Sequence, residues 1–389
     1  MAKLNWPLME NNITQEDRNV LIDFLKQDAI LTQNQQVKAF EAEWSEWLGV
    51  KYSVLVNSGS SANLATLNIL KELYGGGEII VSPLNWVSDI AAVLQNGFKP
   101  VFIDINPKTL GMNDEQIIKK LSSDTRAVLL THILGYNALS QKLLDALKEK
   151  KIMLIEDACE SHGATFKNQK VGSFGFASNF SFYFAHHMTT VEGGMISTND
   201  EKFYETARMM RSHGLVRELT STEMKEGFVK KFPDLNPEFI FAFPAYNIRS
   251  TEINAVLGRN QLKRLNHEIK QRNRNLVFFL NHLDAKKYRT DFAVEGCSNY
   301  ALTLILKNPD QALCDRVMAS LREHGIEFRR GTSGGGNQLR QPYLRRLFGD
   351  EYQKYPEVDH VHFFGFYIGN YPVLGEEKIY KLCQLLNSL

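Results

Sequence analysis

Few cysteines, no excess charge and no long apolar run characterise this sequence of 389 residues. Its four cysteines form no CxxC pair, which speaks against structural zinc or a compact iron–sulphur cluster and indicates reduced thiols. The 45 basic and 44 acidic side chains give a net charge of +1, too little for nucleic-acid binding by bulk charge. The chain has no apolar run of about 18 residues, and its first residues, MAKLNWPLMENN, lack an apolar signal core. We therefore expect a cytoplasmic protein with no metal, nucleic-acid or membrane partner.

Two domains are expected from the length and from a change of pattern along the chain. In the first part, short apolar runs alternate with helical patterns, which indicates βαβ units, a mostly parallel sheet and ligands at the carboxyl ends of its strands. We expect strands at 79–82, 101–103, 127–131 and 153–157, and helices at 61–73, 114–121 and 140–150. A long amphipathic helix over 252–282, bent or broken within, leads to separated strands and helices that predict a smaller α+β domain. We place the large domain at 1–262 and the small one at 263–389.

Directly before an expected helix stands the segment NSGSSA, residues 57–62. Hydroxyl groups, a glycine turn and the free N–H groups of a helix N-terminus favour phosphate or another anion. An ordinary N-cap explains the same residues. From these residues alone, both interpretations stay open.

Two acids, Glu156 and Asp157, end the apolar run at 153–157. Strand ends are where α/β folds place their chemistry, and a partly buried carboxylate there needs a cation or a donor as partner. A protonated heteroaromatic nitrogen would serve. A helix cap at the strand end is the alternative.

Adjacent histidines, His186 and His187, lie in the segment SFYFAHHMTT at 181–190. Neighbouring residues on an extended segment face opposite sides, so a two-histidine metal pair is not expected. Histidine titrates near neutral pH and suits proton transfer, although a lone histidine is more often structural.

Taken together and in this order, these segments resemble the nucleotide-sugar aminotransferase family called DegT/DnrJ/EryC1/StrS, over nearly the whole chain. The marks of that family appear as SGSSA at 58–62, PLNW at 83–86, EDACESHGA at 156–164 and AYNIR at 245–249. The resemblance implies an α/β fold of the aspartate-aminotransferase type, fold type I of the pyridoxal-phosphate enzymes. Such a fold has a large domain with a mostly parallel sheet and a smaller α+β C-terminal domain.

Two residues depart from the family pattern. His186 stands where the family has its Schiff-base lysine, and Glu160 stands where it usually has glutamine. Both departures resemble the 3-dehydratase branch that acts on GDP-4-keto-6-deoxymannose, which binds its cofactor without a covalent bond and uses histidine as the base. A second lysine-free branch holds an iron–sulphur cluster, and the scattered cysteines speak against it.

The resemblance also implies roles for single residues. Asp157 pairs with the pyridine nitrogen of pyridoxal 5'-phosphate or pyridoxamine 5'-phosphate, and His186 is the catalytic acid–base. Trp86 stacks on the cofactor ring, with core packing as its alternative role. The other implied cofactor contacts are Glu160 near the ring hydroxyl, Ser60, Ser61 and Ser181 at the phosphate, and Asn247 from the other subunit. The implied substrate-binding residues are His213, Arg217 and Arg329.

The implied activity is the 3-dehydration of a nucleotide-linked 4-keto-6-deoxyhexose, with L-glutamate as amino donor, in a homodimer with shared active sites. GDP-4-keto-6-deoxymannose is the implied substrate, and dideoxysugar biosynthesis for the O-antigen of lipopolysaccharide is the implied context. Two alternatives remain, a lysine-free aminotransferase and a regulator or scaffold without catalysis. The retained Asp157, Trp86, Ser181 and Asn247 argue against a scaffold, because a dead site needs none of them.

Overall fold

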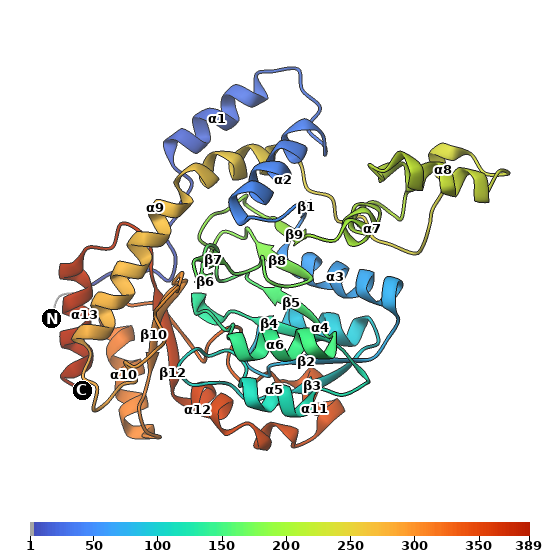
Figure 1. Cartoon of the computed structure of the whole chain (residues 1–389). Helices are drawn as coiled ribbons and strands as arrows, with labels where there is room; N and C mark the ends of the chain where they lie inside the picture. The colour runs from blue at the N-terminus through green and yellow to red at the C-terminus, as the bar shows by residue number, and fades with distance from the viewer. Residues whose placement is uncertain (1–3) are drawn as a thin grey trace.

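A seven-stranded sheet lies at the centre of the larger part of the molecule in this computed structural model, which describes residues 4–389 (Figure 1). Its strands are β1 (Tyr52–Val56), β2 (Glu78–Val81), β3 (Lys99–Phe102), β4 (Thr125–Thr131), β5 (Met153–Asp157), β8 (Ala177–Ser181) and β9 (Gly194–Thr198). Their order is β1-β9-β8-β5-β4-β2-β3. β9 is antiparallel to β1 and β8, and the other neighbouring pairs are parallel. The α/β class and the mostly parallel sheet are therefore confirmed.

Helices cover both faces of this sheet because side chains alternate along each strand. Ile79 and Val81 of β2 pack in one core with α3 (Gly59–Tyr74) and α4 (Val87–Gln95). Ile80, between them, packs in a second core with α2 (Gln35–Leu48), α5 (Asp114–Lys120) and α6 (Gln141–Lys150). α1 (Gln15–Leu25) and α7 (Glu201–Arg211) complete the larger part. The strands and helices expected in this part are all present, with ends within two residues of the expected ones.

The long helix α9 (Glu252–His282) runs for 31 residues without a break, so the expected break is absent, and Figure 1 shows the helix curving along its length. The hydroxyl of Thr251 caps its start. Gly258 provides the space in which the helix packs on the Phe40 ring. α9 contacts α1 and α2 near its start and continues into the smaller part. The expected boundary at 262/263 falls inside this helix, and a division of the chain at that point stays a prediction.

The smaller part is built on a three-stranded antiparallel sheet of β10 (Ala301–Ile305), β12 (Gly365–Gly369) and β11 (Phe328–Arg330), in that order. Its helices are α10 (Gln311–Glu323), α11 (Pro342–Phe348), α12 (Pro356–Phe364) and α13 (Glu376–Asn387). The minor elements of the chain are β6 (Thr165–Phe166), β7 (Gln169–Lys170) and the 3₁₀-helices η1 (Ile133–Gly135), η2 (Val216–Glu218), η3 (Pro237–Phe239), η4 (Gln338–Arg340) and η5 (Glu351–Lys354).

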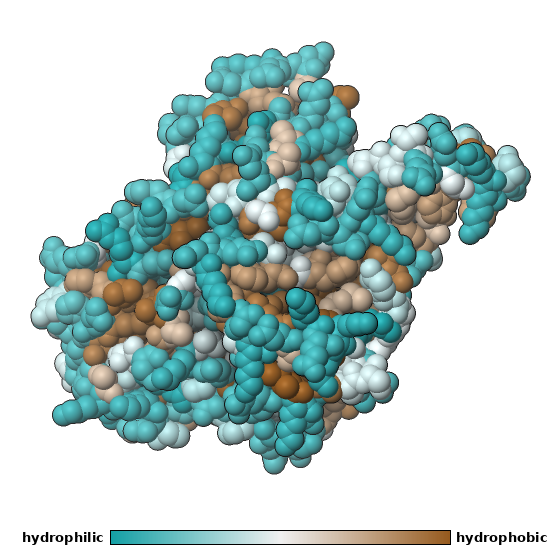
Figure 2. Space-filling model, in the orientation of Figure 1, coloured by the Kyte–Doolittle hydropathy of each residue, from teal (hydrophilic) through white to brown (hydrophobic). Residues whose placement is uncertain are grey.

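Between α7 and α9 the chain leaves the body as an arm, residues 216–244, which carries α8 (Thr222–Lys231) and projects to the right in Figure 1. None of the residues of α8, all of which the structure describes, is buried. Phe239 and Phe241 at the base of the arm are each 57% exposed, and hydrophobic and hydrophilic atoms lie side by side on its surface (Figure 2). Within residues 4–389, every helix is too short or too polar to cross a membrane.

Candidate active site

Three neighbouring strands, β4, β5 and β8, end at the same edge of the large sheet with Thr131, Asp157 and Ser181. Asp157 is buried, and both of its carboxylate oxygens accept hydrogen bonds. Nδ2 of Asn63 on α3 donates to Oδ2 at 2.7 Å, and the backbone N–H of Cys159 donates to Oδ1 at 2.8 Å. These hydrogen bonds fix the orientation of the carboxylate at this strand end.

A second carboxylate, Asp89 on α4, is fully buried beside Asp157. Nδ2 of Asn63 also donates to Oδ1 of Asp89 at 2.6 Å, and the Thr131 hydroxyl donates to its Oδ2 at 2.8 Å. Burial, and then the negative charge of Asp157, raises the pKa of Asp89 well above its usual range. Sequence reasoning missed Asn63 and Asp89, because one polar residue within an amphipathic helix is not a pattern.

The turn before α3 forms an open cradle. The Ser58 hydroxyl caps the helix by accepting from the Ser61 N–H at 3.0 Å. The N-cap interpretation is therefore confirmed, and it does not exclude a phosphate site. The backbone N–H groups of Gly59 and Ser60 have no hydrogen-bond partner among residues 4–389. A Cβ on Gly59 would lie 2.6 Å from Cβ of Ser181, so the helix start and the end of β8 are packed together. Free N–H groups, hydroxyls and a helix N-terminus fit a phosphate.

Trp86 and Glu160 approach the same edge from two loops. Trp86 precedes α4 and its side chain is 51% exposed, with the Gly334 backbone so close that a Cβ there would lie 2.9 Å from the indole. Core packing is therefore not the role of Trp86. Oε2 of Glu160 accepts from the Leu134 N–H of η1 at 2.8 Å, and desolvation raises the pKa of Glu160 to about 7.

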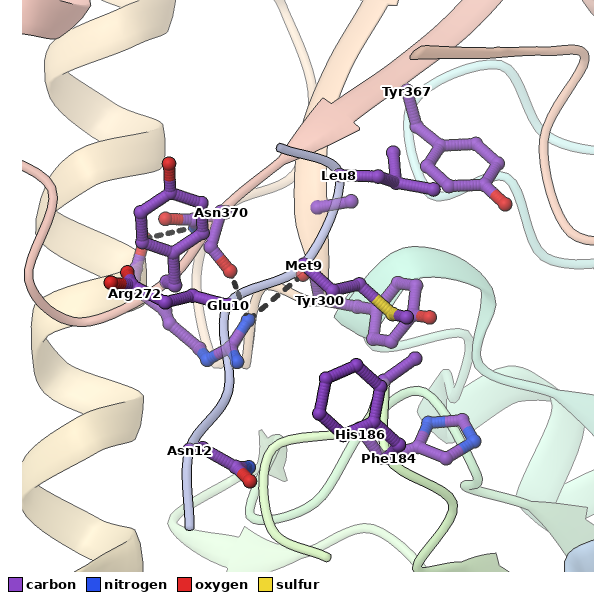
Figure 3. A pocket seen from close by; sticks show the side chains of 13 residues that line it. Leu8, Met9, Glu10, Asn12, Phe184, His186, Arg272, Tyr300, Tyr367 and Asn370 are labelled. Atoms are coloured by element: carbon purple, nitrogen blue, oxygen red, sulfur yellow. Dashed lines mark hydrogen bonds between the residues drawn. The ribbon is translucent and has the colours of Figure 1, made fainter. Parts of the chain in front are cut away.

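His186 lies in the loop after β8 and lines a pocket with residues of the smaller part (Figure 3). Its Nδ1 is buried and has no hydrogen-bond partner within the described chain. Desolvation lowers the pKa of His186 to about 4, with the charge of Asp157 acting in the opposite direction and that of Arg272 in the same direction. The imidazole is therefore neutral at pH 7 and can accept a proton.

The next residue, His187, is fully buried and faces the interior, where its Nε2 lies 3.0 Å from the Ser298 carbonyl. The expectation that the two histidines lie on an extended segment is wrong, because the chain turns here and the His186 N–H donates to the Tyr183 carbonyl at 3.0 Å. The buried His162 ring, which sequence reasoning did not single out, lies 5.9 Å from the His186 ring and 5.3 Å from the His187 ring between centroids. Among the residues that the structure describes, no cluster of histidine, cysteine and acidic side chains is arranged to hold a metal ion.

Of the predicted site residues, only His186 lines this pocket, and four of the others are exposed away from it. His213 and Arg217 are exposed at the base of the arm, where the Arg217 guanidinium lies 5.5 Å from the centroid of the Phe239 ring. Asn247 is exposed beside the end of β1. Arg329 is exposed on β11, opposite Tyr367, which does line the pocket. The roles expected of these residues stay predictions.

The chain is similar to known proteins along nearly its whole length. Residues 11–387 match the family described as the DegT/DnrJ/EryC1/StrS aminotransferase family. The GDP-4-keto-6-deoxy-D-mannose 3-dehydratase of Escherichia coli O55:H7 is 30% identical to this chain, over 98% of this chain and 100% of its own length.

Two solved structures are similar over nearly the whole chain. One is the E. coli GDP-4-keto-6-deoxy-D-mannose-3-dehydratase with bound hydrated PLP, with a TM-score of 0.89 at 27% identity, covering 99% of this chain and 100% of that chain. The other is a GDP-4-keto-6-deoxymannose-3-dehydratase with a trapped PLP-glutamate geminal diamine, with a TM-score of 0.85 at 27% identity, covering 98% and 100%.

Proposed function

The chain belongs to the DegT/DnrJ/EryC1/StrS aminotransferase family, and we propose that it is a lysine-free 3-dehydratase of a nucleotide-linked 4-keto-6-deoxy sugar. One observation carries the proposal. His186 occupies the family's lysine position and lines the pocket, and no lysine is among the pocket-lining residues that the structure describes. An imidazole exchanges protons but cannot form the stable covalent attachment that a lysine amine forms.

The residues at the sheet edge fit pyridoxal phosphate, which relatives of this chain bind. The free N–H groups at the start of α3, with the hydroxyls of Ser60, Ser61 and Ser181, would hold the phosphate. Asp157 would accept a hydrogen bond from the protonated ring nitrogen, and the exposed face of Trp86 would stack on the ring. When bound, the cofactor supplies an amino-group carrier and an electron sink for carbanion chemistry.

Within this site His186 would act as the proton carrier. Its neutral ring accepts a proton at a ring nitrogen and returns it to the reacting carbon, a role that needs a free lone pair at neutral pH. The lowered pKa of His186 supplies that state. Glu160, near the ring hydroxyl, would hold a proton or a charge according to pH, because its pKa lies at about 7.

L-Glutamate as the amino donor and GDP-4-keto-6-deoxymannose as the substrate are proposed from the relatives. Arg329 would bind the pyrophosphate, for which the guanidinium fork is suited. His213, Arg217 and Asn247 are exposed and lie away from the pocket of their own chain, which supports a homodimer in which they act at the partner's site. The four cysteines are free thiols, which supports a cytoplasmic location.

A product analysis tests the proposed function. Enzyme, pyridoxal phosphate, L-glutamate and GDP-4-keto-6-deoxymannose should give a keto sugar with one oxygen atom fewer, together with equimolar 2-oxoglutarate and ammonia. The same mixture with CDP- and dTDP-linked 4-keto sugars identifies the nucleotide. A stable 4-amino sugar without ammonia would instead identify an aminotransferase, and a purified protein that binds no cofactor would identify a scaffold.

Replacing His186 by lysine gives a second test. His186→Lys should attach the cofactor covalently, which appears as a shifted cofactor absorbance band that borohydride reduction makes permanent. Dehydration should fall by about 10²-fold or more, because the proton carrier is lost. An unchanged spectrum would mean that residue 186 does not face the cofactor.

A further inference from the structure

Arg272 on α9 is a buried cation that leaves part of its hydrogen-bonding capacity unused. It is 5% exposed. Its Nη1 donates to the carbonyl oxygens of Tyr300, at 3.0 Å, and Asn370. Nε and Nη2 have no hydrogen-bond partner within residues 4–389, and Nε is completely buried. The two carbonyls fix the plane of the guanidinium and leave its Nε–Nη2 edge open.

No carboxylate of the described chain pairs directly with this charge, although the charge of Glu268 acts favourably on it from a distance. Arg272 takes part in no ion pair among residues 4–389, and Glu268, one turn earlier on α9, is bound to Arg264 at 2.8 Å. Burial lowers the pKa of Arg272 to about 10, so the guanidinium still carries its charge at neutral pH. A buried charge without a partner is costly, which indicates that an anion from outside the chain completes the site.

The open edge and the pocket define what this anion is. Nε and Nη2 together form the fork that binds a carboxylate through two parallel hydrogen bonds. Arg272 and His186 line the same pocket (Figure 3). The pocket has a free volume of about 20 Å³, room for about one water-sized group, so a sugar ring does not fit. Glu10, the acid of this lining, is exposed to water, which screens its charge.

We propose that Arg272 is the receptor for one carboxylate of the amino donor. The inference rests on the proposed function, since it assigns a residue to the donor half of that reaction. It explains why a cation beside the proton carrier His186 is held by main-chain carbonyls rather than by an acid of the chain. An internal acid would occupy the fork and compete with the donor.

The test compares wild type with Arg272→Met, with Arg272→Lys, which keeps the charge but loses the fork, and with Arg274→Met as the control. Arg274 lies on the same helix, is exposed and touches only Gln271 through its guanidinium. The probe is glutarate, a dicarboxylate without an amine, and its Kd for the cofactor-loaded enzyme is measured by calorimetry. We expect Arg272→Met to weaken glutarate binding roughly 10- to 100-fold, as for the loss of charged hydrogen bonds. Arg272→Lys should lie between, and the control should match wild type.

Two donor analogues show whether Arg272 touches the carboxylate itself. L-Glutamine lacks the side-chain carboxylate and L-isoglutamine lacks the α-carboxylate. In wild type, the analogue whose amide replaces the carboxylate that Arg272 binds should react with the cofactor more slowly than glutamate. In Arg272→Met this difference in rate should disappear. Equal glutarate affinity in wild type and both Arg272 variants, or undiminished discrimination against both amides, overturns the inference. If Arg272→Met does not fold, Arg272→Lys decides.

The proposed function is tested separately in the same samples. Enzyme loaded with pyridoxamine phosphate needs no donor, so one turnover of wild type with GDP-4-keto-6-deoxymannose tests the dehydration without any contribution from the donor site. If wild type itself removes no oxygen in this reaction, the proposed function fails, whatever the glutarate affinities are. If wild type does so and the Arg272 variants bind glutarate normally, only the inference about Arg272 fails.

Discussion

The carboxylate pair of Asp89 and Asp157 predicts an unusual dependence of stability on pH. Asp89 is fully buried, shares the Asn63 amide with Asp157 and has a raised pKa, first through burial and then through the charge of Asp157. An acid that binds its proton more tightly in the folded than in the unfolded chain adds stability below its unfolded pKa of about 3.9. That contribution is lost as pH rises towards the folded pKa.

Asp89→Asn removes this titration while keeping the size of the side chain. The amide oxygen can replace only one of the two carboxylate oxygens, so it accepts from the Thr131 hydroxyl or from Asn63 but not from both; this loss shifts the stability by the same amount at every pH. Each pH unit between the unfolded and folded pKa values costs the wild type about 1.36 kcal/mol for one proton. As the pH rises from the unfolded pKa towards the folded one, the variant should therefore gain stability on wild type at up to that rate.

Urea unfolding of the cofactor-free protein, followed by tryptophan fluorescence at several pH values, measures this difference. Asp23→Asn is the matched control, because Asp23 is 71% exposed in α1, and its stability profile should run parallel to wild type. A parallel profile for Asp89→Asn as well would refute the reasoning, since it would mean that Asp89 binds its proton no more tightly in the fold than in the unfolded chain.

Two further variants test the phosphate cradle and the strand that leads into it. Gly59→Ala places a Cβ 2.6 Å from Cβ of Ser181, so cofactor affinity, measured by fluorescence titration, should fall about tenfold or more, in line with an overpacking cost of about 1–3 kcal/mol. Its control, Gly227→Ala, meets no atom within 4 Å in α8 and should be neutral or stabilise by about 0.5–1 kcal/mol. Arg211→Met breaks the buried ion pair with Glu41, 2.5 Å between nitrogen and oxygen, and should lower the free energy of unfolding by about 3–5 kcal/mol in urea; a loss under 1 kcal/mol would contradict the assigned burial.

The strand ends could be read from the sequence because they depend on local pattern. The apolar run at 153–157 ends on Asp157, and in the structure β5 ends there at the carboxyl edge of the sheet. The continuity of α9 could not be read in the same way. Gly258 within it suggests a weak point, yet the packing of the helix on Phe40 uses the missing side chain instead.

Helix residues of the site were missed for a physical reason. Asn63 and Asp89 lie on different helices, and each is an ordinary polar residue in its own segment. They become one network with Asp157 only because α3 and α4 pack on the same face of the sheet and bring the three side chains within hydrogen-bond reach. No spacing along the chain encodes that contact.

The sequence by itself determined the family, four of the seven strands of the large sheet and the presence of His186 at the position where the resemblance implies a lysine. These are matters of residue identity and of periodicity over a few residues. Tertiary structure alone decided that His186 is neutral at pH 7, that Asp89 binds its proton tightly and that the fork of Arg272 is open. Desolvation and unsatisfied hydrogen bonds are produced by many distant residues packing together, and no single residue or motif carries them.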